Sequence, residues 1–166
     1  ERLTEIMKKY HVAPAQINLE ITETAAAHSD MLENNIKILH KQGIEFSLDD
    51  YGSGYSNTDY LFRFPFRIVK IDKTILWEAF KNEKAMIALR NTIRMIKELG
   101  LEIVVEGVEN QEYVDYLTEQ HCDYLQGYFY SKPIPDRDFL ELLRRENAQY
   151  YAERFSKNEL SDIITT

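Results

Sequence analysis

Cysteine is nearly absent from this sequence, and histidine is sparse. The chain has one cysteine, Cys122, and four histidines scattered among its 166 residues. A single cysteine excludes an internal disulfide, and the lack of any Cys and His cluster excludes a zinc ligand set. A metal bound by this chain must therefore be held by oxygen ligands.

Long apolar runs and basic runs are also missing. No stretch approaches the roughly 20 apolar residues that span a bilayer, and the charged segment 1–10 lacks the apolar core of a signal peptide. These absences predict a cytoplasmic protein with no membrane segment in this chain. The formal net charge is −8 and the Lys and Arg residues are dispersed, which argues against DNA binding.

Short apolar, β-branched runs alternate with segments of helical spacing. Strands are predicted over 17–21, 44–48, 67–71, 102–105 and 124–128, and helices over 3–10, 31–42, 58–64, 84–99, 111–119 and 136–146. Gly43 and Gly100 stand where a helix C-cap favours a left-handed residue. The alternation predicts an α/β fold with a parallel sheet, either doubly wound or part of an eight-unit barrel.

Charged or amide side chains stand at the end of every predicted strand. Ligands of parallel sheets bind at the carboxyl ends of the strands, and residues two apart on a strand share a face. We therefore expect one centre formed by Glu20, Asp49, Lys70, Glu106 and Gln126. A lone acid at such a position is usually a helix N-cap or a surface ion pair, but joint occurrence on successive units favours a functional site.

Several carboxylates in one place need a counter-charge, because like charges raise one another's pKa. Divalent ions with hard oxygen ligands, Mg²⁺ or Mn²⁺, would supply it, and adjacent Asp49 and Asp50 suit a pair of ions. Such a pair activates water and stabilises charge on a phosphoryl oxygen. Lys70 fits as the positive group beside the attacking water.

Two neighbouring features leave alternatives open. The glycine-rich segment 50–56, DYGSGYS, is either an ordinary turn or a mobile loop that couples metal binding to closure or to a partner. Tyr128, Phe129 and Tyr130 are either core residues or a stacking surface for a base.

At these motifs the chain resembles the C-terminal two-thirds of the EAL domain family, the cyclic di-GMP phosphodiesterases of bacterial signalling. The matching segments, in family order, are LEITE at 19–23, DDYGSGYS at 49–56, KID at 70–72, EGVE at 106–109, and QGY at 126–128 followed by SKP at 131–133. The resemblance implies a TIM-type barrel and hydrolysis of cyclic di-GMP to linear pGpG with two divalent ions, Mg or Mn.

The resemblance also implies a role for each matching residue. The metal ligands would be Glu20, Asp49, Asp50 and Glu106; the catalytic residues Lys70, Glu109 and Gln126; the substrate-binding residues Tyr128, Ser131 and Pro133; and the anchor of the loop after Asp50 would be Glu23. By the same resemblance, the loop and helix after Asp50 would form a homodimer interface, and a sensory or GGDEF domain would precede the chain.

The family's N-terminal features are absent from this sequence. We find neither the Glu-Ala-Leu strand that names the family nor the asparagine of its next strand, and both contribute metal ligands in the family. We expect a barrel truncated at its N-terminus with roughly five βα units. Residues 1–147 would be the partial EAL domain and 148–166 a C-terminal helical tail, and the isolated chain would be an inactive fragment.

Two other functions compete with the phosphodiesterase. A cyclic di-GMP receptor or a protein-interaction module could derive from the enzyme, but such members typically lose a carboxylate or the lysine, and none is lost within the matching span. A barrel glycosidase would use two opposed acids, whereas adjacent Asp49 and Asp50 with Lys70 suit metal and phosphate better.

Overall fold

The computed structural model describes residues 2–26, 30–54 and 58–154. The chain divides into two compact units, Glu1–Tyr130 and Ser131–Thr166. The family resemblance predicted a different boundary, after residue 147, between the partial EAL domain and a C-terminal helical tail. That boundary stays a prediction. Within the described residues, no helix combines the length and apolar character that crossing a bilayer requires.

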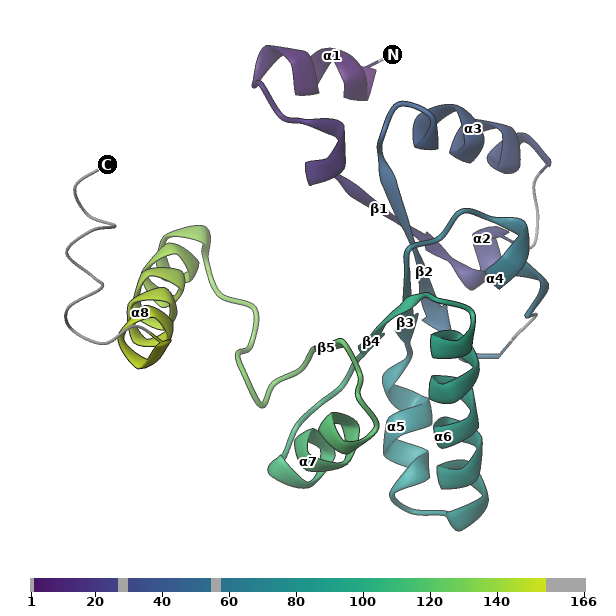
Figure 1. Ribbon diagram of the computed structural model, residues 1–166, viewed down its shortest axis with the longest axis vertical. Helices are drawn as coiled ribbons and strands as arrows, with labels where there is room; N and C mark the ends of the chain where they lie inside the picture. The colour runs from purple at the N-terminus through teal and green to yellow at the C-terminus, as the bar shows by residue number, and fades with distance from the viewer. Residues whose placement is uncertain (1, 27–29, 55–57, 155–166) are drawn as a thin grey trace. The chain divides into compact units, whose positions relative to one another are not determined.

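The first unit is built on a five-stranded parallel sheet in the order β1-β2-β3-β4-β5 (Figure 1). The strands are β1 (Asn18–Thr22), β2 (Glu45–Tyr51), β3 (Ile68–Ile71), β4 (Glu102–Val105) and β5 (Tyr124–Leu125). Neighbours in the sheet are also consecutive in the sequence. This is the strand order of a TIM-type barrel, of which a closed example has eight strands, so the described residues of the first unit supply five consecutive strands of that architecture.

Helices connect the strands. They are α1 (Arg2–Lys9), the 3-10 helix η1 (Pro14–Gln16), α2 (Glu23–Ala26), α3 (Asp30–His40), α4 (Asp59–Arg63), α5 (Lys73–Ala79), α6 (Glu83–Glu98) and α7 (Gln111–Glu119). The sequence did not predict η1, α2 or α5, which are short segments with few turns to reveal a period. Gly43 and Gly100 follow their helices with φ of 89° and 75°, as predicted.

The two faces of the sheet differ in polarity. Phe46, Val69 and Ile103 point to the face that packs against the helices and are at most 1% exposed. The alternate residues, such as Ser47 and Lys70, point to the opposite face, which lines a hollow of about 500 Å³. The apolar half of the strand pattern therefore forms the core, and the polar half faces the interior of the barrel segment.

Three predicted boundaries were wrong by three residues or more. β2 ends at Tyr51 rather than residue 48. β5 ends at Leu125 rather than residue 128, because the chain turns there: Phe129 N–H donates to the carbonyl of Val108, and Tyr130 N–H to that of Gly127. In the second unit, α8 (Asp136–Arg154) continues past residue 146, because no Gly or Pro interrupts it. The predicted tail beyond Arg154 lies outside the described residues.

Candidate functional site

Lys70 is the centre of the polar face. It lies on β3, is 8% exposed, and its Nζ is 3.0 Å from Glu20 Oε1, 2.8 Å from Asp49 Oδ1 and 2.9 Å from Glu106 Oε1. Glu20 comes from β1, Asp49 from β2, and Glu106 directly follows β4. The structure thus brings together four of the five residues that the strand-end pattern predicted to share one centre.

The protonation of Lys70 follows from these contacts. Burial lowers its pKa, but the contacts with Asp49, Glu106 and Glu20 outweigh burial, so the pKa is raised above its ordinary value. The ammonium therefore stays charged at neutral pH. One cation faces three carboxylates, which leaves an excess of negative charge at the carboxyl ends of the strands.

A bulge in β2 adds a fourth carboxylate. Adjacent residues on a regular strand point to opposite faces, yet the register between β2 and β3 shifts between Leu48 and Tyr51. Asp50 lies in this shift with a φ of 58°, in the left-handed region. The irregular backbone lets Asp50 join Asp49 at the rim.

Oxygen atoms of Asp49, Asp50 and Glu106 lie within 4.8 Å of one another. Asp49 Oδ1 is enclosed and, among the described residues, has no hydrogen-bond donor besides its ion pair with Lys70. Burial raises the pKa of Asp50, and the charges of Asp49 and Asp72 raise it further against the opposing effect of Lys70. A cluster of hard, under-neutralised oxygen donors fits a divalent cation such as Mg²⁺, Mn²⁺ or Ca²⁺.

Glu109 and Gln126 lie beside this cluster rather than in it. Both side chains are exposed, and both line a cavity of about 220 Å³ together with Glu106, Trp77 and Tyr128. Gln126 also lines the hollow that contains Glu20 and Lys70. The structure places both residues next to the acidic rim, and their catalytic roles stay predictions.

Glu23 is buried behind the rim at 2% exposure. Its Oε2 accepts the N–H of Gly52, the residue at which the chain turns away after the two aspartates, at 3.2 Å. This is the contact that a loop anchor needs, whereas its effect on activity stays a prediction. The end of the predicted loop, at 55–57, lies outside the described residues.

The predicted substrate-binding residues are divided between the two units. Tyr128 belongs to the first unit and is 61% exposed, Phe129 is 39% exposed and Tyr130 54% exposed, so the interpretation of these aromatics as core was wrong. Ser131 and Pro133 belong to the second unit. Their role in binding substrate stays a prediction.

Trp77 is a site residue that sequence patterns did not predict. Its indole N–H donates to the carbonyl of Gly107 at 2.9 Å, within the turn that separates Glu106 from Glu109. Only the packing of α5 against this turn reveals the contact, because Trp77 and Gly107 are 30 positions apart.

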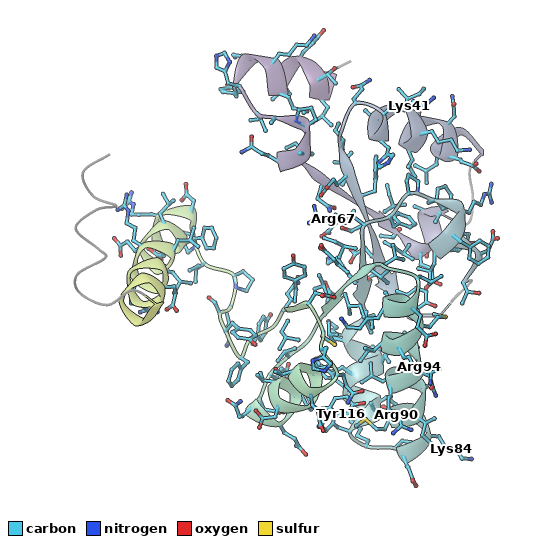
Figure 2. All side chains as sticks on the ribbon, in the orientation of Figure 1. Lys41, Arg67, Lys84, Arg90, Arg94 and Tyr116 are labelled. Atoms are coloured by element: carbon cyan, nitrogen blue, oxygen red, sulfur yellow. The ribbon has the colours of Figure 1, made fainter. Side chains whose placement is uncertain are left out.

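A larger hollow, of about 620 Å³, lies on α6 and at the end of α7. Its described lining includes Arg90 and Arg94 (Figure 2) and Lys97, and one carboxylate, Glu98, which pairs with Arg94 at 2.8 Å. We therefore assign the functional site to the acidic rim.

Comparison with known proteins places this site in a family. The EAL domain matches residues 1–133. The cyclic di-GMP phosphodiesterase RocR of Pseudomonas aeruginosa is 33% identical over 143 residues, which are 85% of this chain and 36% of RocR. The chain thus spans about a third of this relative.

Solved structures agree with the fold. The EAL domain of Mycobacterium smegmatis DcpA matches with a TM-score of 0.79 at 30% identity, over 86% of this chain and 65% of that chain. Klebsiella pneumoniae BlrP1, determined as a manganese and cyclic di-GMP complex, matches with a TM-score of 0.73 at 27% identity, over 79% of this chain and 34% of that chain. The predicted TIM-type fold is confirmed, and the chain belongs to the EAL domain family.

Proposed function

We propose that this chain carries most of the catalytic groups of a metal-dependent cyclic di-GMP phosphodiesterase, which opens the cyclic dinucleotide to linear pGpG. The observation that carries the proposal is the convergence of Glu20, Asp49 and Glu106 on the Lys70 ammonium, with Asp50 added by the bulge of β2. Similarity to RocR supplies the substrate.

Glu20, Asp49, Asp50 and Glu106 would hold two divalent ions, Mg²⁺ or Mn²⁺. Ions bound there would promote ionisation of a water molecule at neutral pH and neutralise charge on the phosphoryl oxygens. An all-oxygen donor set in which oxygen atoms of Asp49, Asp50 and Glu106 lie within 4.8 Å of one another, with the Lys70 ammonium as the cation beside them, suits such hard cations.

The remaining groups would orient the reactants. The Lys70 ammonium, charged at neutral pH, would donate hydrogen bonds to the attacking water, and Glu109 and Gln126 would orient water and lysine from the adjacent cavity. Hydrolysis adds water across one P–O3′ bond, so the phosphorus gains the water oxygen and the leaving 3′-oxygen gains a proton. Tyr128, Ser131 and Pro133 would contact the nucleotide.

We further propose that the chain by itself hydrolyses cyclic di-GMP poorly. Its sheet supplies five strands, whereas a closed TIM-type barrel has eight, and ligands expected from the other strands would be missing. The chain should be incubated with cyclic di-GMP and Mn²⁺, with RocR in parallel, and pGpG measured by chromatography. Turnover comparable to that of RocR would overturn this part of the proposal.

A chimera tests whether the residues present are competent. In RocR, the segment aligned with this chain would be replaced by residues 1–133, and folding checked by circular dichroism. We expect pGpG formation that requires Mn²⁺ and is lost in the Lys70→Ala chimera, while cyclic di-GMP binding persists. A folded chimera that binds cyclic di-GMP without turning it over would instead establish the receptor function.

Assembly and location remain part of the proposal. A homodimer would form through the loop and helix after Asp50, and a sensory or GGDEF domain would precede the chain in a cytoplasmic signalling protein. Analytical ultracentrifugation of the chain with and without Mn²⁺ tests the dimer, and an unchanged monomer mass would count against it.

A further inference from the structure

The turn after β4 carries two acidic residues of the site, Glu106 and Glu109. Backbone hydrogen bonds fix both sides of the turn: Glu106 N–H donates to the carbonyl of Ile71, and Val108 N–H to that of Gln126, both at 3.1 Å. Between them lies Gly107, with a φ of 72°. The carbonyl of Gly107 lies beyond the β4 ladder, and it accepts the indole N–H of Trp77 at 2.9 Å.

The helix α5 packs directly against this turn. A Cβ built on Gly107 would lie 2.3 Å from Lys73 Cβ and 3.0 Å from Trp77 Nε1, so any larger residue at this position would push the turn and the helix apart. Lys73 also holds its ammonium over the Trp77 ring, 5.5 Å from the centroid. The Trp77 ring therefore contacts the Lys73 ammonium, and its N–H binds the backbone of the turn.

We propose that Trp77 is a positioning residue that fixes the Glu106 to Glu109 turn for metal binding. This inference rests on the proposed function, because it concerns the same carboxylates. Rotation of the peptide at Gly107 would turn the backbone next to Glu106, and the indole hydrogen bond opposes that rotation. The packing of α5 alone needs only an aromatic ring, whereas positioning needs the N–H donor as well.

Two substitutions separate these roles. Trp77→Phe keeps an aromatic ring and removes the donor, while Trp77→His keeps a ring N–H on a smaller side chain. Asn91→Ala is the matched control, because Asn91 Nδ2 donates to the carbonyl of Ile87 at the same distance of 2.9 Å, within α6 and on the exposed surface. Circular dichroism and thermal unfolding establish that each variant is folded.

The measurement is Mn²⁺ affinity by isothermal titration calorimetry on the whole chain. Loss of a residue that orients metal ligands typically weakens binding by about 10-fold or more, and we expect about 10-fold weaker binding for Trp77→Phe. Trp77→His should recover part of the loss, and Asn91→Ala should match the wild type. A folded Trp77→Phe chain that binds Mn²⁺ as tightly as the wild type would overturn the inference and leave the metal site standing.

Failure of the proposed function gives a different result. If neither the wild-type chain nor the RocR chimera that carries residues 1–133 takes up Mn²⁺, the proposed metal site is wrong and the positioning role falls with it. Trp77 is the one tryptophan of the sequence, so its fluorescence provides a second measurement. Mn²⁺ should quench the Trp77 emission of the wild-type chain and leave it unchanged in the Glu106→Gln chain. Equal quenching in both chains would contradict binding beside the turn.

Discussion

Asp50 combines two unfavourable features in a single residue. Its backbone is in the left-handed region with a φ of 58°, and its pKa is raised by burial and by the charges of Asp49 and Asp72. Neither feature stabilises the fold, and the backbone conformation places this carboxylate at the rim. This is the pattern of a residue retained for function at the expense of stability.

Asp50→Asn should therefore stabilise the metal-free chain. The substitution removes repulsion from Asp49 and Asp72, and asparagine adopts the left-handed conformation readily. We expect a gain of less than about 1 kcal/mol in the free energy of unfolding, because the site is partly exposed. Urea denaturation without metal measures it.

Adding Mn²⁺ provides the control for Asp50→Asn. A bound ion stabilises the folded state, so the wild-type chain should gain more stability from Mn²⁺ than the variant. A variant that is less stable than the wild type without metal would show that the carboxylate of Asp50 supports the fold.

The Cys122 thiol should react slowly with alkylating reagents in the folded chain. Burial raises its pKa from the ordinary value of 9.0 to about 12, with Lys97 lowering it and Asp123 raising it further. The thiolate is the reactive form, so at pH 9 iodoacetamide should modify the folded chain far more slowly than the chain in urea. Mass spectrometry over time measures both rates, and equal rates would refute the burial of this thiol.

At the scale of elements, the strands were more predictable than the way they end. Short apolar, β-branched runs predicted all five strands, and the two-residue period of a strand predicted that Glu20, Lys70 and Glu106 would meet. The bulge in β2 was not predictable, because nothing in the letters Asp49-Asp50 states that the register shifts there. Adjacent acids pointed to a metal pair, while the backbone that unites them appeared only in the structure.

Long-range contacts between elements were the other unpredictable part. The hydrogen bond from Trp77 to Gly107 spans 30 positions and depends on how α5 packs against the turn after β4. Secondary-structure propensity depends on residues that are close in the sequence, so it cannot predict contacts between residues far apart in it. Ser131 and Pro133 belong to the second unit, so their predicted role depends on an arrangement that strand and helix patterns do not encode.

Glu23→Ala should loosen the turn after β2. The variant leaves the Gly52 N–H without the carboxylate oxygen that accepts it at 3.2 Å and removes a side chain that is 2% exposed. We expect a loss of about 2 kcal/mol in the free energy of unfolding and faster amide exchange at Gly52. Exchange monitored by NMR tests this, with exposed Thr24→Ala on the same helix as control. An unchanged Gly52 rate would exclude the anchoring role.

At the scale of the whole molecule, the sheet has two edges. Among the residues that the structure describes, β1 pairs only with β2 and β5 only with β4, and Asn18, Glu20 and Thr22 on β1 are exposed. Open edges of parallel sheets offer unpaired backbone groups to other chains. The same openness gives solvent access to the hollow behind Lys70.

The isolated chain should therefore self-associate with increasing concentration. We expect the mass from light scattering to rise with concentration, and amide exchange in β1 to slow as it does, because edge pairing protects backbone N–H groups. Central β3 provides an internal control whose exchange should stay constant. A constant monomer mass, with β1 exchange independent of concentration, would rule out edge pairing.

Arg67 holds the end of the sheet opposite to the site. It precedes β3, and its guanidinium contacts Glu45 Oε2 at the start of β2 at 2.5 Å and Glu102 Oε1 at the start of β4 at 3.1 Å (Figure 2). Ion pairs thus join the three central strands at their amino ends, whereas the rim acids repel one another at the carboxyl ends of the same strands. Cations bound among the rim acids would relieve that repulsion, while the ion pairs of Arg67 keep the amino ends in register.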